Sequence, residues 1–516
     1  MKWRIRSGWT EWPKHRREVN QKVSTETTAP AATDLVTLSL ISHTNVGKTT
    51  LARTLLRKDV GDALDQPHVT VSNDAYTMLS IPGEGEQGEA ELRLWDTPGF
   101  GDTARLLRRL KKIERPLGWF VNQVWDRFTD RPLWCSQQAV KNVRDDADVV
   151  LYLINASAEE PGAAGYVDME MKILGWIGKP VIVLLNQSGP PRRPEVEQAE
   201  ESAWRVHLQG DEVVKAVISL DAFARCWVQE GELLEVIGSV LPKEKEEVYG
   251  RLKSAWREKN LAIFDASMEA AAGQIAASSK DSEPAEKERF FQKLGIGRGE
   301  LNASMKEARN KLAERLAARI QETTDQLVKL HGLSGKSARK MMEITRENFG
   351  EPQQVNENLM TILGGVSAGA AGGLAADAAA GGLTFGGGAV VGGIGGGAGA
   401  YLLAKGFNLS RGEENGVRWS KGHFRAQFGQ ALLNYLAVAH FGRGRGEWED
   451  GEPPEFWKNE VRRVTEEQGE RIDEVWKDGA TQKADLGKLQ KEGQAVMTDC
   501  TREILKSLYP DAVFWA

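Results

Sequence analysis

The chain has 516 residues, of which 41% are hydrophobic and 27% charged, and its formal net charge is −6. This length exceeds what one hydrophobic core usually serves, so we expect two or more domains. The acidic balance provides no basic field, and we predict no nucleic-acid partner. The three cysteines lie far apart without metal-ligand spacing, which is typical of reduced thiols in a cytoplasmic protein.

Residues 1–34 combine basic side chains with tryptophans. They lack the apolar run of a signal peptide, so we do not expect export. The composition predicts a disordered basic leader. The alternative is a basic-aromatic segment that rests on an anionic membrane surface.

Residues 35–245 alternate short β-branched runs with amphipathic stretches, the pattern of an α/β domain. We expect a mixed, mostly parallel sheet with flanking helices. The expected strands are Leu35–Ile41, Tyr76–Ile81, Glu91–Trp95, Val149–Ile154, Val181–Leu185 and Val214–Ile218.

The first expected strand leads straight into Ser42-His43-Thr44-Asn45-Val46-Gly47-Lys48-Thr49-Thr50, and helical sequence follows. This order is the context that a phosphate-binding P-loop requires, because loop amides and the helix N-terminus face the phosphates. Gly47 lets the backbone approach, Lys48 reaches the β- and γ-phosphates, and the Thr49 hydroxyl ligates Mg²⁺. Ser42 stands where the pattern usually has its first glycine. The predicted nucleotide-binding residues here are Thr44, Asn45, Val46, Gly47, Lys48, Thr49 and Thr50.

A second motif, Asp96-Thr97-Pro98-Gly99, ends the third expected strand about 50 residues after the P-loop. Asp96 is placed to hold Mg²⁺ through water, and the Gly99 amide to sense the γ-phosphate. Thr70, in the loop between the motifs, is the candidate switch threonine on Mg²⁺; the alternative is a solvated loop threonine. We therefore predict a P-loop NTPase of the GTPase type, with Lys48, Thr70 and Gly99 as catalytic residues and Thr49, Thr70 and Asp96 as magnesium site.

Base recognition departs from the usual pattern. The strand Val181–Leu185 ends in Asn186-Gln187-Ser188-Gly189, where GTPases carry Asn-Lys-x-Asp. Asn186 matches, Gln187 replaces the lysine, and Gly189 replaces the carboxylate that recognises guanine, which weakens the case for guanine over adenine. Ser219 and Leu220 occupy the place of the loop whose backbone touches the base. Guanine remains the predicted base because every other element has GTPase order.

The stretch Leu106–Asp146 holds three tryptophans among alternating charges. We expect it to be a helical extension of the second switch that packs on the second domain. The alternative is a packed, immobile insertion.

Residues 246–516 are predicted to form an all-α domain. Helical periodicity marks Lys243–Ser278, Glu286–His331 and Gly422–His440, and helical sequence also runs from Phe456 to about Leu508.

Residues 361–404 are apolar and rich in glycine and alanine, with Asp377 as their only charge. Glycines recur every four residues, a spacing that lets helices approach closely and is favoured in membranes. The segment divides into two legs of roughly 20 residues, each long enough to span a bilayer. The sequence therefore leaves two hypotheses open: a helical hairpin that contacts or enters a membrane, and a glycine-zipper hairpin buried among soluble helices.

The motifs resemble those of the Era- and TrmE-like GTPases. This resemblance implies that Asn45 could help to hold a K⁺ ion beside the phosphates. Phe100 follows Asp96-Thr97-Pro98-Gly99, where Ras-like proteins place a water-orienting glutamine, so hydrolysis is expected to be slow without activation. An ion, a partner or self-association as a homodimer would supply that activation.

A wider resemblance covers nearly the whole chain after residue 35. Four stretches are similar to bacterial GTPases fused to a C-terminal domain of unknown function 3482. They are His43-Thr44-Asn45-Val46-Gly47-Lys48-Thr49, Asp221-Ala222-Phe223-Ala224-Arg225-Cys226-Trp227, the Gly-rich segment, and Tyr435-Leu436-Ala437-Val438-Ala439-His440-Phe441-Gly442-Arg443-Gly444-Arg445-Gly446. The family name supplies no cellular role.

These features favour a GTP-hydrolysing switch whose helical half responds to GTP or GDP, in the cytoplasm or at a membrane surface. Two alternatives remain. One is a nucleotide-binding scaffold with negligible turnover. The other is a membrane-active effector gated by the nucleotide domain.

Overall fold

A computed structural model places the main elements of both halves of the chain. It describes residues 34–58, 73–83, 88–101, 103–110, 131–189, 191–284, 298–333, 410–411, 416–441, 453–481 and 484–512. The leader 1–33, the candidate switch threonine Thr70 and the Gly/Ala-rich segment 361–404 lie outside the described residues.

The first half is built on a six-stranded sheet in the order β2-β3-β1-β4-β5-β6. Its strands are β1 (Leu35–Ser42), β2 (Asp74–Ile81), β3 (Ala90–Asp96), β4 (Val149–Asn155), β5 (Val181–Asn186) and β6 (Val214–Ser219). Strand β2 pairs antiparallel with β3, and every other pairing is parallel. The predicted mixed, mostly parallel α/β fold is confirmed. Each expected strand overlaps an observed one and ends within two residues of it.

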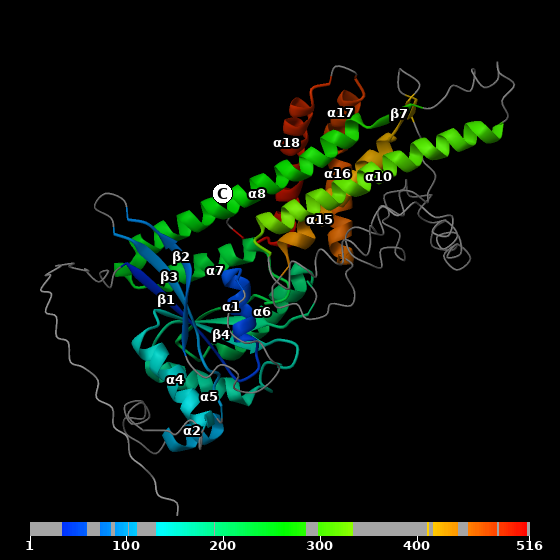
Figure 1. Ribbon diagram of the computed structural model, residues 1–516. Helices are drawn as coiled ribbons and strands as arrows, with labels where there is room; N and C mark the ends of the chain where they lie inside the picture. The colour runs from blue at the N-terminus through cyan, green and yellow to red at the C-terminus, as the bar shows by residue number, and fades with distance from the viewer. Residues whose placement is uncertain are drawn as a thin grey trace, which may run out of the picture.

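Helices cover both faces of this sheet (Figure 1). On one face lie α1 (Lys48–Leu56) and α7 (Trp227–Val240), and on the other lie α2 (Thr103–Leu110), α4 (Arg131–Asp145), α5 (Gly165–Ile177) and α6 (Pro194–Leu208). Because α2 and α4 share their apolar cluster with α5, they pack on the face turned away from the helical half. The predicted packing of Leu106–Asp146 on the second domain is therefore wrong for the described part of that stretch.

The second half is helical, as predicted. Its helices are α8 (Lys243–Lys280), α10 (Arg298–Leu330), α15 (Lys421–Ala439), α16 (Glu455–Glu467), α17 (Gly469–Gly479) and α18 (Leu486–Leu508). The helical run expected from Phe456 is divided into three helices. The breaks fall around Gly469 and Gly479, and the Asp485 side chain caps α18 by accepting a hydrogen bond from Gly487 N at 2.8 Å.

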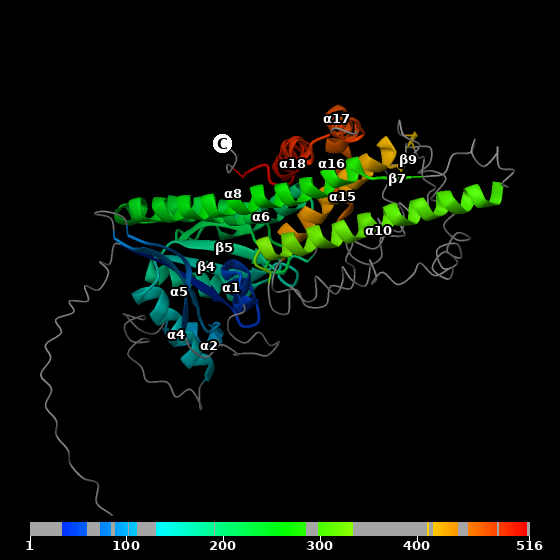
Figure 2. The same cartoon turned by 45° about the horizontal axis from the view of Figure 1, so that its top comes forward.

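Helix α8 belongs to both halves. Its first turns pack against β1, β2 and β3, and its later turns pack against α10, α17 and α18 (Figure 2). One hydrophobic cluster continues from the sheet through α1, α7 and α8 into α15, α16 and α18. The predicted boundary between residues 245 and 246 falls inside this helix.

A small antiparallel sheet joins the end of α8 to the segment before α15. It consists of β7 (Ser282–Pro284), β8 (Ser410–Arg411) and β9 (Gly416–Arg418). Across the described parts of both halves, every helix is too short or too polar to cross a bilayer.

Candidate nucleotide-binding site

The loop between β1 and α1 has the backbone shape of a phosphate-binding turn. Asn45 and Gly47 adopt left-handed conformations with φ of 65° and 90°, and Gly47 is the N-cap residue of α1. A Cβ at Gly47 would lie 2.9 Å from Asn186 Nδ2, so this position requires glycine. The turn ends at the N-terminus of α1, where free backbone amides favour the binding of an anion. Thr44 and Val46 complete the turn, and Thr50 lies in the first turn of α1.

Lys48 carries a buried ammonium group at this helix start; the residue is 7% exposed. Its Nζ donates to Ser42 Oγ at 2.8 Å, so the serine in place of the usual glycine provides a hydrogen-bond acceptor. Burial lowers the pKa of Lys48, and the negative charges of Asp96 and Glu170 oppose that shift. The described partners of Lys48 Nζ are neutral oxygens of Ser42 and His43, so the buried ammonium group is suited to bind a phosphate oxygen.

Thr49 and Asp96 form the candidate magnesium site. Thr49 Oγ1 donates to Asp96 Oδ2 at 2.6 Å. The other carboxylate oxygen, Asp96 Oδ1, is buried without a hydrogen-bond partner among the described residues. Burial raises the pKa of Asp96 to about 6, while the bond from Thr49 and the charge of Lys48 lower it. A hydroxyl beside a carboxylate with a spare oxygen fits Mg²⁺, which takes oxygen ligands.

The segment after Asp96 closes directly on the P-loop. A Cβ at Gly99 would lie 3.0 Å from Lys48 Nζ and 3.1 Å from Thr44 N, so only glycine fits without displacement. Phe100 N donates to Ser42 O at 2.9 Å. The Phe100 side chain is fully buried in the apolar cluster beneath α2, α4 and α5. It therefore points into the core and cannot orient water.

A buried carboxylate, Glu170 of α5, links the P-loop to the segment after Gly99. It is completely buried and accepts from Tyr152 Oη at 2.7 Å and from Thr103 Oγ1 at 2.8 Å. Its Oε1 also lies 2.8 Å from His43 Nδ1. His43 belongs to the P-loop and Thr103 begins α2, so one side chain bridges both segments. Glu170 could not be identified from the sequence, because 127 residues separate it from His43.

At the base end of the site, Asn186 ties the P-loop to the loop after β6. Its Nδ2 donates to Val46 O at 2.7 Å, and its Oδ1 accepts from Ala222 N at 2.9 Å. Gln187 adopts a left-handed conformation with φ of 59°, and its side-chain amide lies beside Gly47. The side chain of Gln187 thus lies over the P-loop.

The contacts of Ser219 and Leu220 with a base stay a prediction. Ser219 N donates to Glu201 Oε1 at 2.7 Å, and Leu220 N donates to Leu185 O at 3.0 Å. Both amides are already satisfied inside the domain. The first side chain beyond them is that of Asp221, to which the sequence analysis gave no role although it begins a recognised segment.

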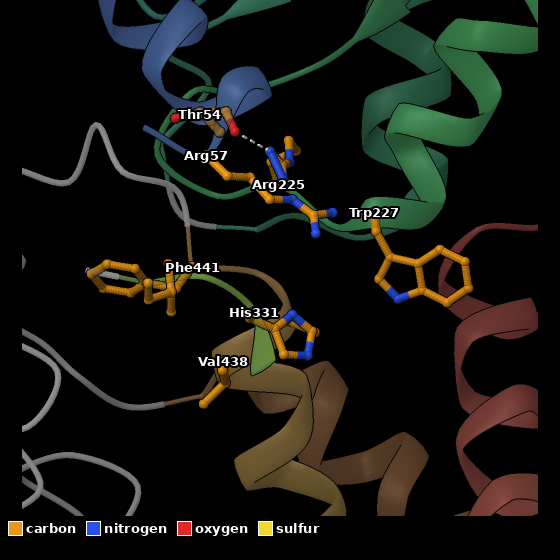
Figure 3. Close-up of a pocket in the computed structure, with 9 residues that line it drawn as sticks. Thr54, Arg57, Arg225, Trp227, His331, Val438 and Phe441 are labelled. Carbon is orange, nitrogen blue, oxygen red and sulfur yellow. Dashed lines mark hydrogen bonds between the residues drawn. The ribbon is translucent and has the colours of Figure 1, made fainter. Parts of the chain in front are cut away.

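A second polar cluster lies where the two halves meet (Figure 3). It lines a cavity of about 10 Å³, space for about one water molecule. Arg225 Nη1 donates to Thr54 O at 2.6 Å and also pairs with the buried Glu230. His331 faces this cavity, and burial beside Arg57 and Arg225 lowers its pKa to about 3. The cavity is too small for a nucleotide, and we infer that these residues hold the two halves of the chain together.

Two sequence families match the chain. The first, described as 50S ribosome-binding GTPase, matches residues 37–187. The second, described as Domain of unknown function (DUF3482), matches residues 212–504, more than half of the chain. A search of curated proteins finds no match.

Solved structures with some similarity include GTPases bound to nucleotides. Era in complex with MgGDPNP and nucleotides 1506–1542 of 16S ribosomal RNA is 18% identical, with 41% of this chain and 58% of that chain covered and a TM-score of 0.29. This chain thus spans little more than half of that structure. A variant of Aquifex aeolicus Era bound to GDP·AlF4⁻ is 14% identical, with 58% and 99% covered and a TM-score of 0.28. The mGMPPNP-bound NFeoB from S. thermophilus is 14% identical, with 61% of this chain and 89% of that chain covered and a TM-score of 0.22.

Proposed function

The chain belongs to the DUF3482 family and carries a GTPase-type nucleotide-binding domain before it, and from this premise we propose a GTP-hydrolysing switch. GTP with Mg²⁺ occupies the P-loop, and hydrolysis to GDP changes how the second switch and the helical half are held. The division into residues 35–245 and 246–516 is part of this proposal.

The observation that carries the proposal is the arrangement of Lys48, Thr49 and Asp96. The buried ammonium of Lys48 supports binding of the β- and γ-phosphates, and loop amides from Thr44 to Thr50 complete the cradle. The Thr49 hydroxyl and the Asp96 carboxylate would hold Mg²⁺, which supplies charge compensation to the phosphates when bound. Thr70 is proposed to close on the same ion.

Hydrolysis by this site is proposed to be slow without activation. Phe100, which follows Gly99, is directed into the core, where it cannot orient a water molecule. Asn45 lies exposed at a left-handed turn of the P-loop and is the proposed K⁺ residue. An activating partner or a homodimer is the proposed alternative source of activation.

The coupling to the helical half is proposed to follow the loop after β6. Asn186 connects the P-loop to Ala222, and three residues later Arg225 N donates to His440 O at 3.2 Å. Ala224 and Phe441 form an isolated β-bridge at the same place. A change at the phosphates therefore reaches the end of α15 through a short series of contacts.

A binding and turnover assay tests the proposal. We expect a fluorescent GTP analogue to bind in the presence of Mg²⁺ and phosphate to be released faster in K⁺ than in Na⁺. Lys48→Ala and Thr49→Ala should each reduce affinity or turnover at least about tenfold, whereas Lys58→Ala, just beyond α1, serves as a control for loss of a positive charge. Absence of binding by folded wild-type protein with Mg²⁺ would refute the proposal.

The buried Phe100 also favours a second candidate function, a scaffold that binds nucleotide without turnover. That function predicts the same binding titration but no phosphate release in Na⁺ or K⁺.

Membrane contact by residues 361–404 remains a proposal from the sequence, as does a cytoplasmic location. Co-sedimentation with anionic liposomes, with and without a deletion of residues 361–404, tests it. If the deleted protein sediments as well as wild type, this segment is not the contact.

A further inference from the structure

The turn after β5 lacks a carboxylate at the position from which a GTPase usually recognises guanine. Gly189 occupies that position with φ of 89°, and a Cβ built on it would meet no atom within 4 Å. No described atom outside the neighbouring residues would therefore contact a Cβ at this position. A carboxylate from a neighbouring segment could act in its place.

Asp221 brings such a carboxylate from the adjacent loop. It lies two residues beyond β6, which pairs in parallel with β5, so the two loops leave the sheet at the same edge. Burial raises the pKa of Asp221, while the amides of Phe223, Ser188, Gly189 and Ala224 lower it, which places its carboxyl against the turn 186–189.

One oxygen of this carboxylate lacks a well-aligned hydrogen bond. Asp221 is only 7% exposed, and its Oδ1 accepts from Phe223 N at 2.7 Å. Its Oδ2 is buried and makes no hydrogen bond of good geometry to the described residues, although the amides of Ser188 and Gly189 lie close enough to stabilise the charged carboxylate. Ser188 Oγ also lacks a hydrogen-bond partner among the described residues. A buried carboxylate oxygen without a well-aligned donor costs free energy, and a ligand that supplies such a donor would recover it.

A carboxylate can distinguish guanine from adenine by the hydrogen-bonding groups that each base presents. Guanine presents two adjacent donors, N1–H and the 2-amino group, which match a carboxylate and its two oxygens. Adenine presents the N1 lone pair and no 2-amino group, so it would place an acceptor against a negative charge. The same carboxylate would therefore favour guanine and reject adenine.

We propose that Asp221 is the residue that determines guanine specificity, in place of the carboxylate missing at Gly189. This inference rests on the proposed function, because it concerns the base end of the same nucleotide site. Asn186 holds the two loops together by bonding Val46 O and Ala222 N, and so positions Asp221.

The test exchanges the hydrogen-bonding character of this one side chain. Asp221→Asn presents a donor and an acceptor, which match xanthine, where a carbonyl replaces the 2-amino group. We expect Asp221→Asn to lose affinity for GTP on the order of 100-fold and to gain affinity for XTP, measured by competition against a fluorescent nucleotide with Mg²⁺. Glu197→Gln is the matched control, since Glu197 is a neighbouring carboxylate whose pKa is raised in part by the charge of Asp221. It should leave the GTP to XTP ratio within about twofold.

Each outcome decides the point. An unchanged GTP to XTP ratio in folded Asp221→Asn, or a reversal in Glu197→Gln instead, overturns the assignment while leaving the proposed function intact. Equal loss of GTP and XTP binding also overturns it, since that is the signature of a structural role. If wild type binds no triphosphate at all, the proposed function fails. Should Asp221→Asn not fold, wild type decides: we expect GTP to bind at least about tenfold more tightly than ITP, which lacks the 2-amino group, and equal affinities refute the assignment.

Discussion

Replacing Arg225 by alanine should destabilise the protein at the junction of its two halves. Arg225 is 6% exposed, and its guanidinium donates to Thr54 O at the end of α1 and pairs with Glu230 of α7, which is 1% exposed. The substitution removes one partner of a buried pair and leaves the carboxylate of Glu230 buried. Arg57 remains as its only other described cation, with Nη2 at 3.4 Å from Oε2.

Breaking a buried ion pair from one side typically costs about 3–5 kcal/mol. Because Arg57 stays near Glu230, we expect the lower end, about 3 kcal/mol. The exposed pair Lys253–Glu235 is the matched control: its atoms are 2.7 Å apart, but the side chains are 34% and 51% exposed. Lys253→Ala should therefore cost less than about 1 kcal/mol.

Urea unfolding followed by circular dichroism measures both values. The double variant Arg225→Ala with Glu230→Gln should recover part of the loss, because the buried charge disappears together with its partner. If Arg225→Ala costs no more than Lys253→Ala, the pair is not the buried contact described here, and the reasoning is wrong.

Three further predictions concern stability. The pKa of His331 lies near 3 in the folded protein and near 6.5 in the unfolded protein, so its contribution to the free energy of unfolding is full above pH 6.5 and is lost on acidification. Unfolding titrations should show that the free energy of unfolding falls by about 2 kcal/mol between pH 6.5 and 5. His331→Asn should abolish this fall. Burial and the charges of Glu201 and Asp511 raise the pKa of Glu232 to about 7, so the free energy of unfolding falls as pH rises from 4.5 to 7. Glu232→Gln should be more stable than wild type by about 1–2 kcal/mol at pH 8 and equally stable at pH 4.5. The same difference at both pH values would show that the titration of Glu232 is not its cause. Gly479→Ala would set a Cβ 2.2 Å from Ser279 Oγ and should cost about 1–3 kcal/mol in thermal unfolding, whereas Gly250→Ala, which meets no atom within 4 Å in α8, should add about 0.5–1 kcal/mol.

The sheet and the phosphate end of the site were predictable because their signals are local. Strands such as Val149–Asn155 are continuous apolar runs, as buried parallel strands require. Gly47, Lys48 and Thr49 are adjacent in the sequence, and their proposed roles follow from one turn and one helix start. The sequence of the P-loop alone therefore predicts most of the phosphate end of the candidate site.

Groups that meet only through the fold were not predictable. Glu170 reaches His43 across 127 residues and lies in the middle of an ordinary amphipathic helix. Asp221 is a single acidic residue in the loop after β6. Its carboxylate meets the turn at Gly189 only in the folded chain, so neither this contact nor the state of its Oδ2 could be predicted. The packing of Leu106–Asp146 was predicted wrongly because periodicity identifies an apolar helix face but not the face of the sheet that it covers.

The way α8 joins the halves limits how a nucleotide signal can reach the helical part. This helix is 38 residues long, packs on β1 and β3 near its start and on α18 further along, and contains no break. A rigid rotation of the helical half about a flexible linker is therefore not available within the described residues. The proposed coupling would instead pass through packed contacts that can adopt two arrangements, as interfaces and cores can. The contacts of Arg225 with Thr54 and His440 join the P-loop helix to the end of α15, and so they are the place where such a rearrangement would be transmitted.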